Sequence, residues 1–117
     1  MTTPRLIDTA ALETALHEFA DQRDWHGFHS PKNLAMALTG EVGELVEIFQ
    51  WLTEEQSKGV ARHPATSEAV RDELADVLLY LVRLASVLEV DLNAAVVAKL
   101  AKNAKKYPVG GAAPSRP

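Results

Sequence analysis

The chain has 117 residues, enough for one domain with a small hydrophobic core. Apolar residues make up 47% and charged residues 24%, and the formal net charge of −4 argues against a broad basic surface for a nucleic acid polymer. The sequence contains no cysteine, which excludes disulfides, zinc–thiolate sites and thiol catalysis. No apolar run reaches the length of a membrane span and the first residues lack a hydrophobic signal core, so we expect a cytoplasmic protein without membrane contact.

An all-α fold is expected, because no segment carries a strong strand signal and most prolines and glycines fall between helical patterns. The four expected helices cover about residues 9–24, 30–51, 66–88 and 91–107. Each is preceded by a polar residue that can accept a hydrogen bond from a free backbone N–H at the helix start. These expected N-caps are Asp8 or Thr9, then Ser30 with Pro31 in the first helical position, Thr66 or Ser67, and finally Asp91.

The connecting and terminal segments complete this organisation. Residues 53–66 are polar and contain Gly59 and Pro64, so they are expected to form a loop. Residues 1–107 are expected to form a single domain, and the glycine- and proline-rich residues 108–117 a mobile tail.

The apolar residues of these helices recur at helical spacing and predict a four-helix bundle-like domain. Because they occupy wide arcs on short helices, a partner chain is expected to cover part of them in a homo-oligomer. The expected core positions are Leu12, Leu16, Phe19, Leu34, Leu38, Val42, Leu45, Val46, Phe49, Val70, Leu74, Val77, Leu78, Leu81 and Leu88.

Two pairs of acidic residues lie inside the helical patterns. Glu41 and Glu44 are three residues apart, and so are Glu73 and Asp76, so each pair lies on one helix face about a turn apart. If the two helices pack side by side, the carboxylates meet, and their mutual repulsion calls for a cation. Oxygen ligands suit a hard divalent ion such as Mg²⁺, with Mn²⁺ as a substitute. Because Mg²⁺ usually also binds substrate phosphates, the pattern indicates a metal-dependent enzyme acting on a phosphorylated small molecule.

The alternative interpretation of the acids is a solvated charge stripe, since this spacing is common on exposed helix faces. Three features favour the metal site. Gly43 interrupts the first acidic pair, and a glycine inside a helix suggests a close approach to the backbone. The opposite helix faces are apolar and would anchor the ligands. Trp51 follows Glu44 by seven residues, and Tyr80 follows Glu73 by the same distance, which predicts an aromatic side chain near each acidic face.

The last helix carries Lys99 and Asn103, four residues apart on one face. They predict a phosphate or sugar contact or, equally, part of a solvated lysine stripe near a helix C-terminus. None of the four histidines stands three residues after an acid, which argues against a di-iron bundle. The sequence has no glycine-rich phosphate loop and no nucleophile elbow, and the spacing singles out neither Arg71 nor Arg83.

In their order along the chain, these residues match a known family pattern. Glu-x-x-Glu is followed, after 28 residues, by Glu-x-x-Asp. The flanking stretches that agree are Arg23-Asp24-Trp25, Phe28-His29, Pro31-Lys32-Asn33-Leu34, Gly40 to Leu45, Phe49-Gln50-Trp51, Val77 to Leu81, and Lys99 with Asn103 before Tyr107-Pro108. From about Phe19 to Pro108 the chain resembles the MazG-like all-α nucleoside triphosphate pyrophosphohydrolases, and it is most similar to their dCTP pyrophosphatase branch. The loop of residues 53–67 departs from the pattern.

The resemblance implies a site and an assembly. The acids that would bind Mg²⁺ and carry the catalysis are Glu41, Glu44, Glu73 and Asp76. The residues that would bind substrate are Trp25, Trp51 and Tyr80 around the base, and Lys99 and Asn103 at the phosphates or sugar. The resemblance also implies a homodimer or a dimer-of-dimers tetramer, with the site near a subunit interface.

The reaction implied is cleavage of dCTP or a modified pyrimidine nucleotide between the α- and β-phosphates, giving the monophosphate and pyrophosphate in nucleotide-pool cleaning. A metal-bound water would attack the α-phosphorus, and either Glu41 or Glu44 would accept its proton. Two alternatives stay open. The same fold would act on dUTP or phosphoribosyl-ATP, or the chain would be a non-enzymatic helical interaction module, which leaves Gly43 and the aromatic faces unexplained.

Overall fold

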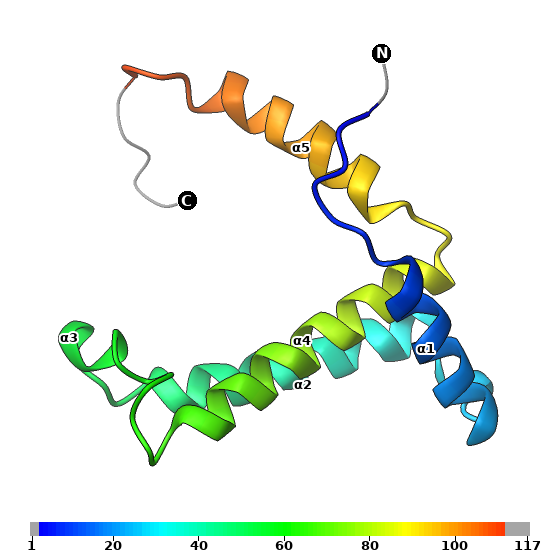
Figure 1. Cartoon of the computed structure of the whole chain (residues 1–117), viewed down its shortest axis with the longest axis horizontal. Coiled ribbons are helices and arrows are strands. Elements are labelled where there is room, and N and C mark those ends of the chain that lie inside the picture. The colour runs from blue at the N-terminus through cyan, green and yellow to red at the C-terminus, as the bar shows by residue number, and fades with distance from the viewer. Residues whose placement is uncertain (1–2, 112–117) are drawn as a thin grey trace.

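Helices form all the regular secondary structure in the computed structural model, which describes residues 3–111 (Figure 1). The all-α prediction is confirmed for this part of the chain. The elements in chain order are α1 (Ala10–Gln22), the 3-10 helix η1 (His26–Phe28), α2 (Pro31–Phe49), α3 (Glu54–Ser57), α4 (Ser67–Val87) and α5 (Leu92–Lys106).

Two of the expected N-caps, at the starts of α2 and α5, make side-chain hydrogen bonds. The Ser30 hydroxyl accepts a hydrogen bond from the Asn33 N–H at 3.2 Å, and Pro31 occupies the first turn of α2. The Asp91 carboxylate accepts from the Ala94 N–H at 3.0 Å and starts α5. Both starts are therefore determined by local side-chain chemistry that the sequence displays.

Helix ends are less well predicted from the sequence than helix starts. The first helix was expected to reach Asp24, but α1 ends at Gln22 because Asp24 takes a left-handed conformation with φ of 55°. Glu89, with φ of 58°, follows the end of α4 in the same way. The second helix was expected to reach Trp51, but α2 ends at Phe49.

The segment expected to be a loop contains the short helix α3, so that expectation is wrong in part. The Thr53 hydroxyl accepts from the Gln56 N–H at 3.1 Å, and the Gln56 side chain accepts from the Thr53 N–H at 3.0 Å. This reciprocal capping box stabilises a single helical turn. Its Thr-x-x-Gln signature is visible in the sequence.

Tertiary packing is concentrated between α2 and α4, which lie side by side, with α1 packed against α4 (Figure 1). The side chains of Leu34 on α2 and Val82 on α4 are fully buried between these elements. Together with Ala20, Val60, Val70 and Ala85 they form the small apolar core of the described chain. The acidic residues lie on this α2–α4 pair.

A single chain does not close the expected four-helix bundle. α5 extends away from the α2–α4 pair, and the N-terminal segment crosses it (Figure 1). At this crossing the side-chain oxygen Asn93 Oδ1 accepts from the Leu6 N–H at 2.8 Å. The radius of gyration is 17.3 Å, compared with about 13 Å for a compact domain of 100 residues. Within the described chain, α2 packs against α4 and α1 packs against α4, while α5 does not complete a bundle with them.

Many expected core positions are therefore exposed. Leu74, Leu78 and Leu81 form one stripe on α4 and are 55%, 49% and 41% exposed. On α2, Val42 and Val46 lie a turn apart and are 41% and 53% exposed. Apolar stripes of this kind lose their hydration only when another surface covers them.

The end of the chain was expected to be a mobile tail. Its described part, residues 108–111, forms a turn in which the Gly111 N–H donates to the Pro108 carbonyl at 3.1 Å. Residues 112–117 of that expected tail lie outside the described residues. Among residues 3–111, no helix combines the length and the apolar character that crossing a membrane requires.

Candidate active site

The paired helices bring three of the four predicted acids into one cluster. Glu41 comes from α2, and Glu73 and Asp76 come from α4. One carboxylate oxygen from each of the three lies within 4.8 Å of the other two. The sequence predicted that four carboxylates meet, and the side-by-side packing of α2 and α4 brings three of them together.

Two oxygens in this cluster have no hydrogen-bond donor. Glu41 Oε2 and Glu73 Oε2 are buried, and within the described part of the chain no group hydrogen-bonds to either. A buried acceptor without a partner is costly, and a bound cation would remove that cost. The oxygen-only donor set, drawn from two packed helices, fits a hard divalent ion.

Electrostatics within the cluster point the same way. Burial, followed by hydrogen bonding and repulsion from Glu41 and Glu44, raises the pKa of Glu73 to about 7. Burial also raises the pKa of Glu41, with further repulsion from Glu44 and Asp76, although a hydrogen bond from Glu73 acts in the opposite direction. Without a cation, the cluster therefore retains protons near neutral pH that isolated carboxylic acids would release.

Glu44 occupies a different position from the other three acids. Its side chain is exposed, and it is not part of the three-carboxylate cluster. Its carboxylate nevertheless helps to raise the pKa of both Glu41 and Glu73. Glu44 thus lies at the solvent rim of the cluster.

A cavity of about 230 Å³ adjoins the acids, and Asp76 belongs to both. Trp25 from the α1–η1 connection and Tyr80 from α4 are on its wall, so the structure brings together two of the three aromatic residues predicted to surround a base. Trp25 also packs edge-on against Phe19, with ring centroids 5.6 Å apart. The other residues that line the cavity are Leu16, His29, Leu34, Leu79 and Arg83.

Three other predicted site residues lie apart from this cavity. Trp51 follows the end of α2 and is 87% exposed. Lys99 and Asn103 belong to α5, which extends away from the α2–α4 pair (Figure 1). Within one described chain, none of these three residues lines the cavity.

Gly43 was expected to permit a close approach to the α2 backbone. A Cβ added at this position would meet no atom of the described chain within 4 Å. The approach that the sequence suggested is therefore not made within the described chain.

Arg83 lines the cavity although its position in the sequence did not predict a role for it. It is the one buried charged side chain in residues 3–111, with an exposed fraction of 6%. Its spacing does contain a signal, because Asp76, Tyr80 and Arg83 follow one another at four and three residues and therefore share one stripe of α4. His29, which contacts Arg83, comes from a distant segment, and no local pattern links the two.

Comparison with known proteins identifies the family and agrees with the fold. The model of the MazG-like family matches residues 37–114. The chain is 50% identical over 106 residues to bovine (Bos taurus) dCTP pyrophosphatase 1, a match that covers 91% of this chain and 61% of that protein. The human (Homo sapiens) dCTP pyrophosphatase 1 is also 50% identical, over 105 residues, covering 90% of this chain and 60% of that protein. The chain thus spans about three fifths of the length of these curated relatives.

A solved structure extends the agreement to three dimensions. The crystal structure of a pyrophosphatase from Archaeoglobus fulgidus superposes with a TM-score of 0.79 at 38% identity, covering 92% of this chain and 99% of that one. Fold and site together define an all-helical protein with an acidic cluster beside an aromatic cavity. The chain belongs to the MazG-like family.

Proposed function

We propose that this protein is a Mg²⁺-dependent nucleoside triphosphate pyrophosphohydrolase that converts dCTP or a modified pyrimidine nucleotide into the monophosphate and pyrophosphate. The observation that carries the proposal is the convergence of Glu41, Glu73 and Asp76 beside a cavity walled by Trp25 and Tyr80. A metal site next to an aromatic pocket suits a molecule with phosphates at one end and a base at the other. The names of the bovine and human relatives support the choice of dCTP.

Each acid has a distinct role in this proposal. Glu41, Glu73 and Asp76 would hold the cation, because one oxygen of each converges and both Glu41 and Glu73 have a buried oxygen without a donor. Bound Mg²⁺ would supply an activated water and neutralise charge on the departing pyrophosphate. Glu44 lies at the exposed rim and outside the three-carboxylate cluster, which favours it over Glu41 as the group that accepts the proton of the attacking water. The new bond joins the water oxygen to the α-phosphorus. The bond between the α-phosphorus and the oxygen that links it to the β-phosphate breaks, and pyrophosphate leaves.

We propose further that a second copy of the chain completes the site, as a homodimer or a dimer-of-dimers tetramer in the cytoplasm. Lys99, Asn103 and Trp51 lie apart from the cavity of their own chain, so they would meet substrate only across a subunit interface. The exposed stripe of Leu74, Leu78 and Leu81 supports self-association, because burial of apolar surface is the usual driving force for assembly.

The proposed reaction is tested by incubating the purified protein with Mg²⁺ and individual triphosphates, including dCTP, its modified pyrimidine analogues, dUTP and phosphoribosyl-ATP. Mass analysis of the products is expected to show dCMP and pyrophosphate, and chelation of the metal should stop their formation. A preference for dUTP or phosphoribosyl-ATP would change the substrate but keep the chemistry. Release of single phosphates, or no turnover with any of them, would overturn the proposal.

Two substitutions test the site itself. Asp76→Asn and Glu44→Gln are each expected to lower turnover by about 100-fold or more. Loss of one group that stabilises transition-state charge typically lowers kcat by this amount. Glu47→Gln provides a matched control, since Glu47 is an exposed residue on the same helix as Glu44. Full activity in either site variant would remove these residues from the proposed mechanism.

A further inference from the structure

Arg83 is a buried cation without an acidic partner. Its side chain lies one turn beyond Tyr80 on α4 and lines the same cavity. Within residues 3–111, Lys58 pairs with Glu55, Asp21 contacts His26, and no carboxylate pairs with Arg83. Burying a charge without an opposite charge is unfavourable, so hydrogen bonds must offset the cost of burying the Arg83 guanidinium.

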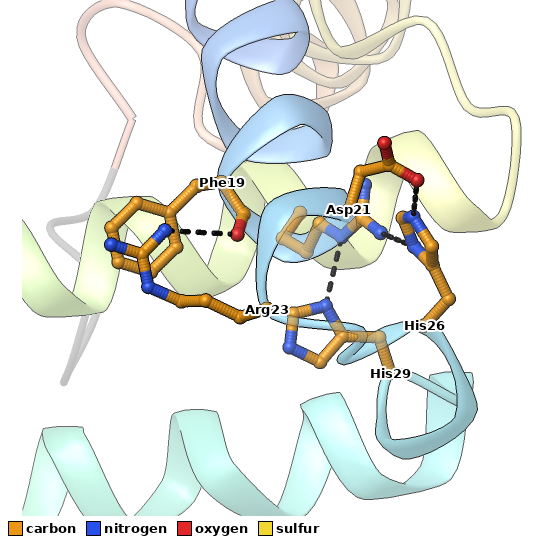
Figure 2. Close-up of polar contacts among 6 residues, drawn as sticks. Phe19, Asp21, Arg23, His26 and His29 are labelled. Carbon is orange, nitrogen blue, oxygen red and sulfur yellow. Dashed lines mark hydrogen bonds and ion pairs between the residues drawn. The ribbon is translucent and has the colours of Figure 1, made fainter.

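Two histidines hold the guanidinium in place. Arg83 Nε donates to His29 Nδ1 at 3.0 Å, and Arg83 Nη2 contacts His26 Nδ1 at 3.2 Å. His26 Nε2 in turn lies 3.2 Å from Asp21 Oδ1, a contact that Figure 2 shows between the end of α1 and the segment that follows it. Both histidines accept from Arg83 only as neutral rings. Burial, aided by the charge of Arg83, lowers the pKa of His29 and keeps it in that form.

These contacts orient the guanidinium and leave donors free. A guanidinium has five N–H donors in a fixed planar fork. The two histidines use donors on Nε and Nη2, and no acceptor within residues 3–111 is bonded to Nη1. Nη1 is also not one of the buried atoms that lack a partner, so it keeps access to solvent. Arg83 also lines the cavity, which is where a ligand would meet its free donors.

The position of Arg83 along α4 indicates which part of a nucleotide it would meet. Arg83 lies seven residues beyond Asp76, about 10 Å along the helix. The acids therefore mark the phosphate end of the site, while Arg83, Trp25 and Tyr80 mark the base end. A planar donor fork at that end suits a base edge with two adjacent acceptors.

We infer that Arg83 is a specificity-determining residue that recognises the cytosine ring through its O2 and N3 acceptors. This inference rests on the proposed function and deepens it. Uracil and thymine carry a hydrogen on N3, so the same fork would face a donor and leave a buried N–H without an acceptor. The dCTP preference is thereby assigned to a bidentate contact, with His26 and His29 as positioning residues.

The test compares kcat/KM for dCTP, dUTP, dTTP and dGTP between the wild type and Arg83→Met, which retains bulk but has no donors. The ratio of dCTP to dUTP is expected to fall by about 5- to 150-fold, the usual discrimination of one bidentate contact. Arg83→Lys keeps the charge but not the fork and is expected to lose most of the same ratio. An equal loss for all bases would overturn the inference and place Arg83 at the phosphates or in a purely structural role.

A substrate analogue makes the test independent of whether the variants fold. In 3-deaza-dCTP a C–H group replaces N3, so the wild type is expected to use it at least about 5-fold less well than dCTP. Arg83→Met should not distinguish the two substrates. Equal use of both by the wild type would overturn the base contact while leaving the pyrophosphohydrolase activity intact. Absence of turnover with any triphosphate would instead overturn the proposed function and, with it, this inference.

Discussion

The protonation of Glu73 links the stability of this protein to its proposed chemistry. Its pKa rises from 4.5 to about 7 in the folded chain, so between these values the folded state binds a proton that the unfolded state releases. Proton binding by Glu73 therefore stabilises the folded, metal-free protein at low pH. The free energy of unfolding is expected to fall as pH rises from 4.5 to about 7, because this stabilisation is lost. Glu73→Gln removes the titration. The variant should gain stability relative to the wild type as pH rises, while its turnover falls.

The measurement is chemical denaturation of both proteins in the presence of a chelator at several pH values. Glu47→Gln is the control, because Glu47 is exposed on α2 and lies outside the three-carboxylate cluster. A difference between wild type and Glu73→Gln that stays constant with pH would contradict the prediction. Saturating Mg²⁺ should reverse the order of stability, because only the wild type offers the full ligand set.

His29 is expected to make stability depend on pH in the opposite direction. Burial and the charge of Arg83 lower its pKa below the ordinary 6.5, so the unfolded state binds the proton more readily. The stabilising contribution of neutral His29, which accepts from Arg83 and neighbours His26, is complete above pH 6.5 and is lost as pH falls below it. His29→Gln should therefore differ most from the wild type at neutral pH, with the difference shrinking on acidification.

Because Glu73 and His29 act in opposite directions below pH 6.5, each is measured as a difference between wild type and variant. His63→Gln serves as the control for His29, since His63 is an exposed residue in the segment before α4. A difference between wild type and His29→Gln that grows on acidification would show that the ring is charged in the folded protein.

At the scale of single elements, the N-cap of α2 is expected to contribute to the stability of the whole fold. Ser30 caps this helix, and α2 makes the main contact with α4. Ser30→Ala leaves the Asn33 N–H without its acceptor and is expected to lower the free energy of unfolding by about 1 kcal/mol. Thr14→Ala, at an exposed position inside α1, should not destabilise, because alanine is the better helix former. Equal effects of the two changes in denaturant titrations would contradict the capping role.

At the scale of the whole molecule, the exposed apolar stripe on α4 predicts assembly. Leu78, the central residue of that stripe, is 49% exposed in the single chain. Leu78→Glu would bury a charge in the proposed interface and is expected to shift the protein to monomers in sedimentation experiments. Turnover should fall at the same time, if Lys99 and Asn103 reach substrate from a second chain. Val109→Glu, on a fully exposed side chain, is the control.

A wild-type protein that sediments as a monomer, or a Leu78→Glu variant that keeps the wild-type mass, would rule out an interface at this stripe. The shape of the chain makes assembly the expected result. A radius of gyration of 17.3 Å and the α5 helix standing away from the α2–α4 pair are features of a chain that leaves much of its surface for contact (Figure 1).

Short-range features of this protein were predictable from its sequence. The 3.6-residue helical period determines that Glu41 and Glu44 share a face, and that Glu73 and Asp76 do so. Cap residues such as Ser30 mark helix starts because their hydrogen bonds reach only three residues. Family resemblance added the likeness to pyrophosphohydrolases, which the comparisons support.

Long-range features were decided by the tertiary structure alone. Arg83 meets His26 across 57 residues, and no local spacing encodes that contact. The described chain does not close a bundle, and neither Trp51 nor α5 lines the cavity. Both features depend on which apolar helix faces pack against one another. The physical reason is that helical periodicity follows from backbone geometry within a few residues. The pairing of faces depends instead on complementary packing between segments that are far apart in the chain.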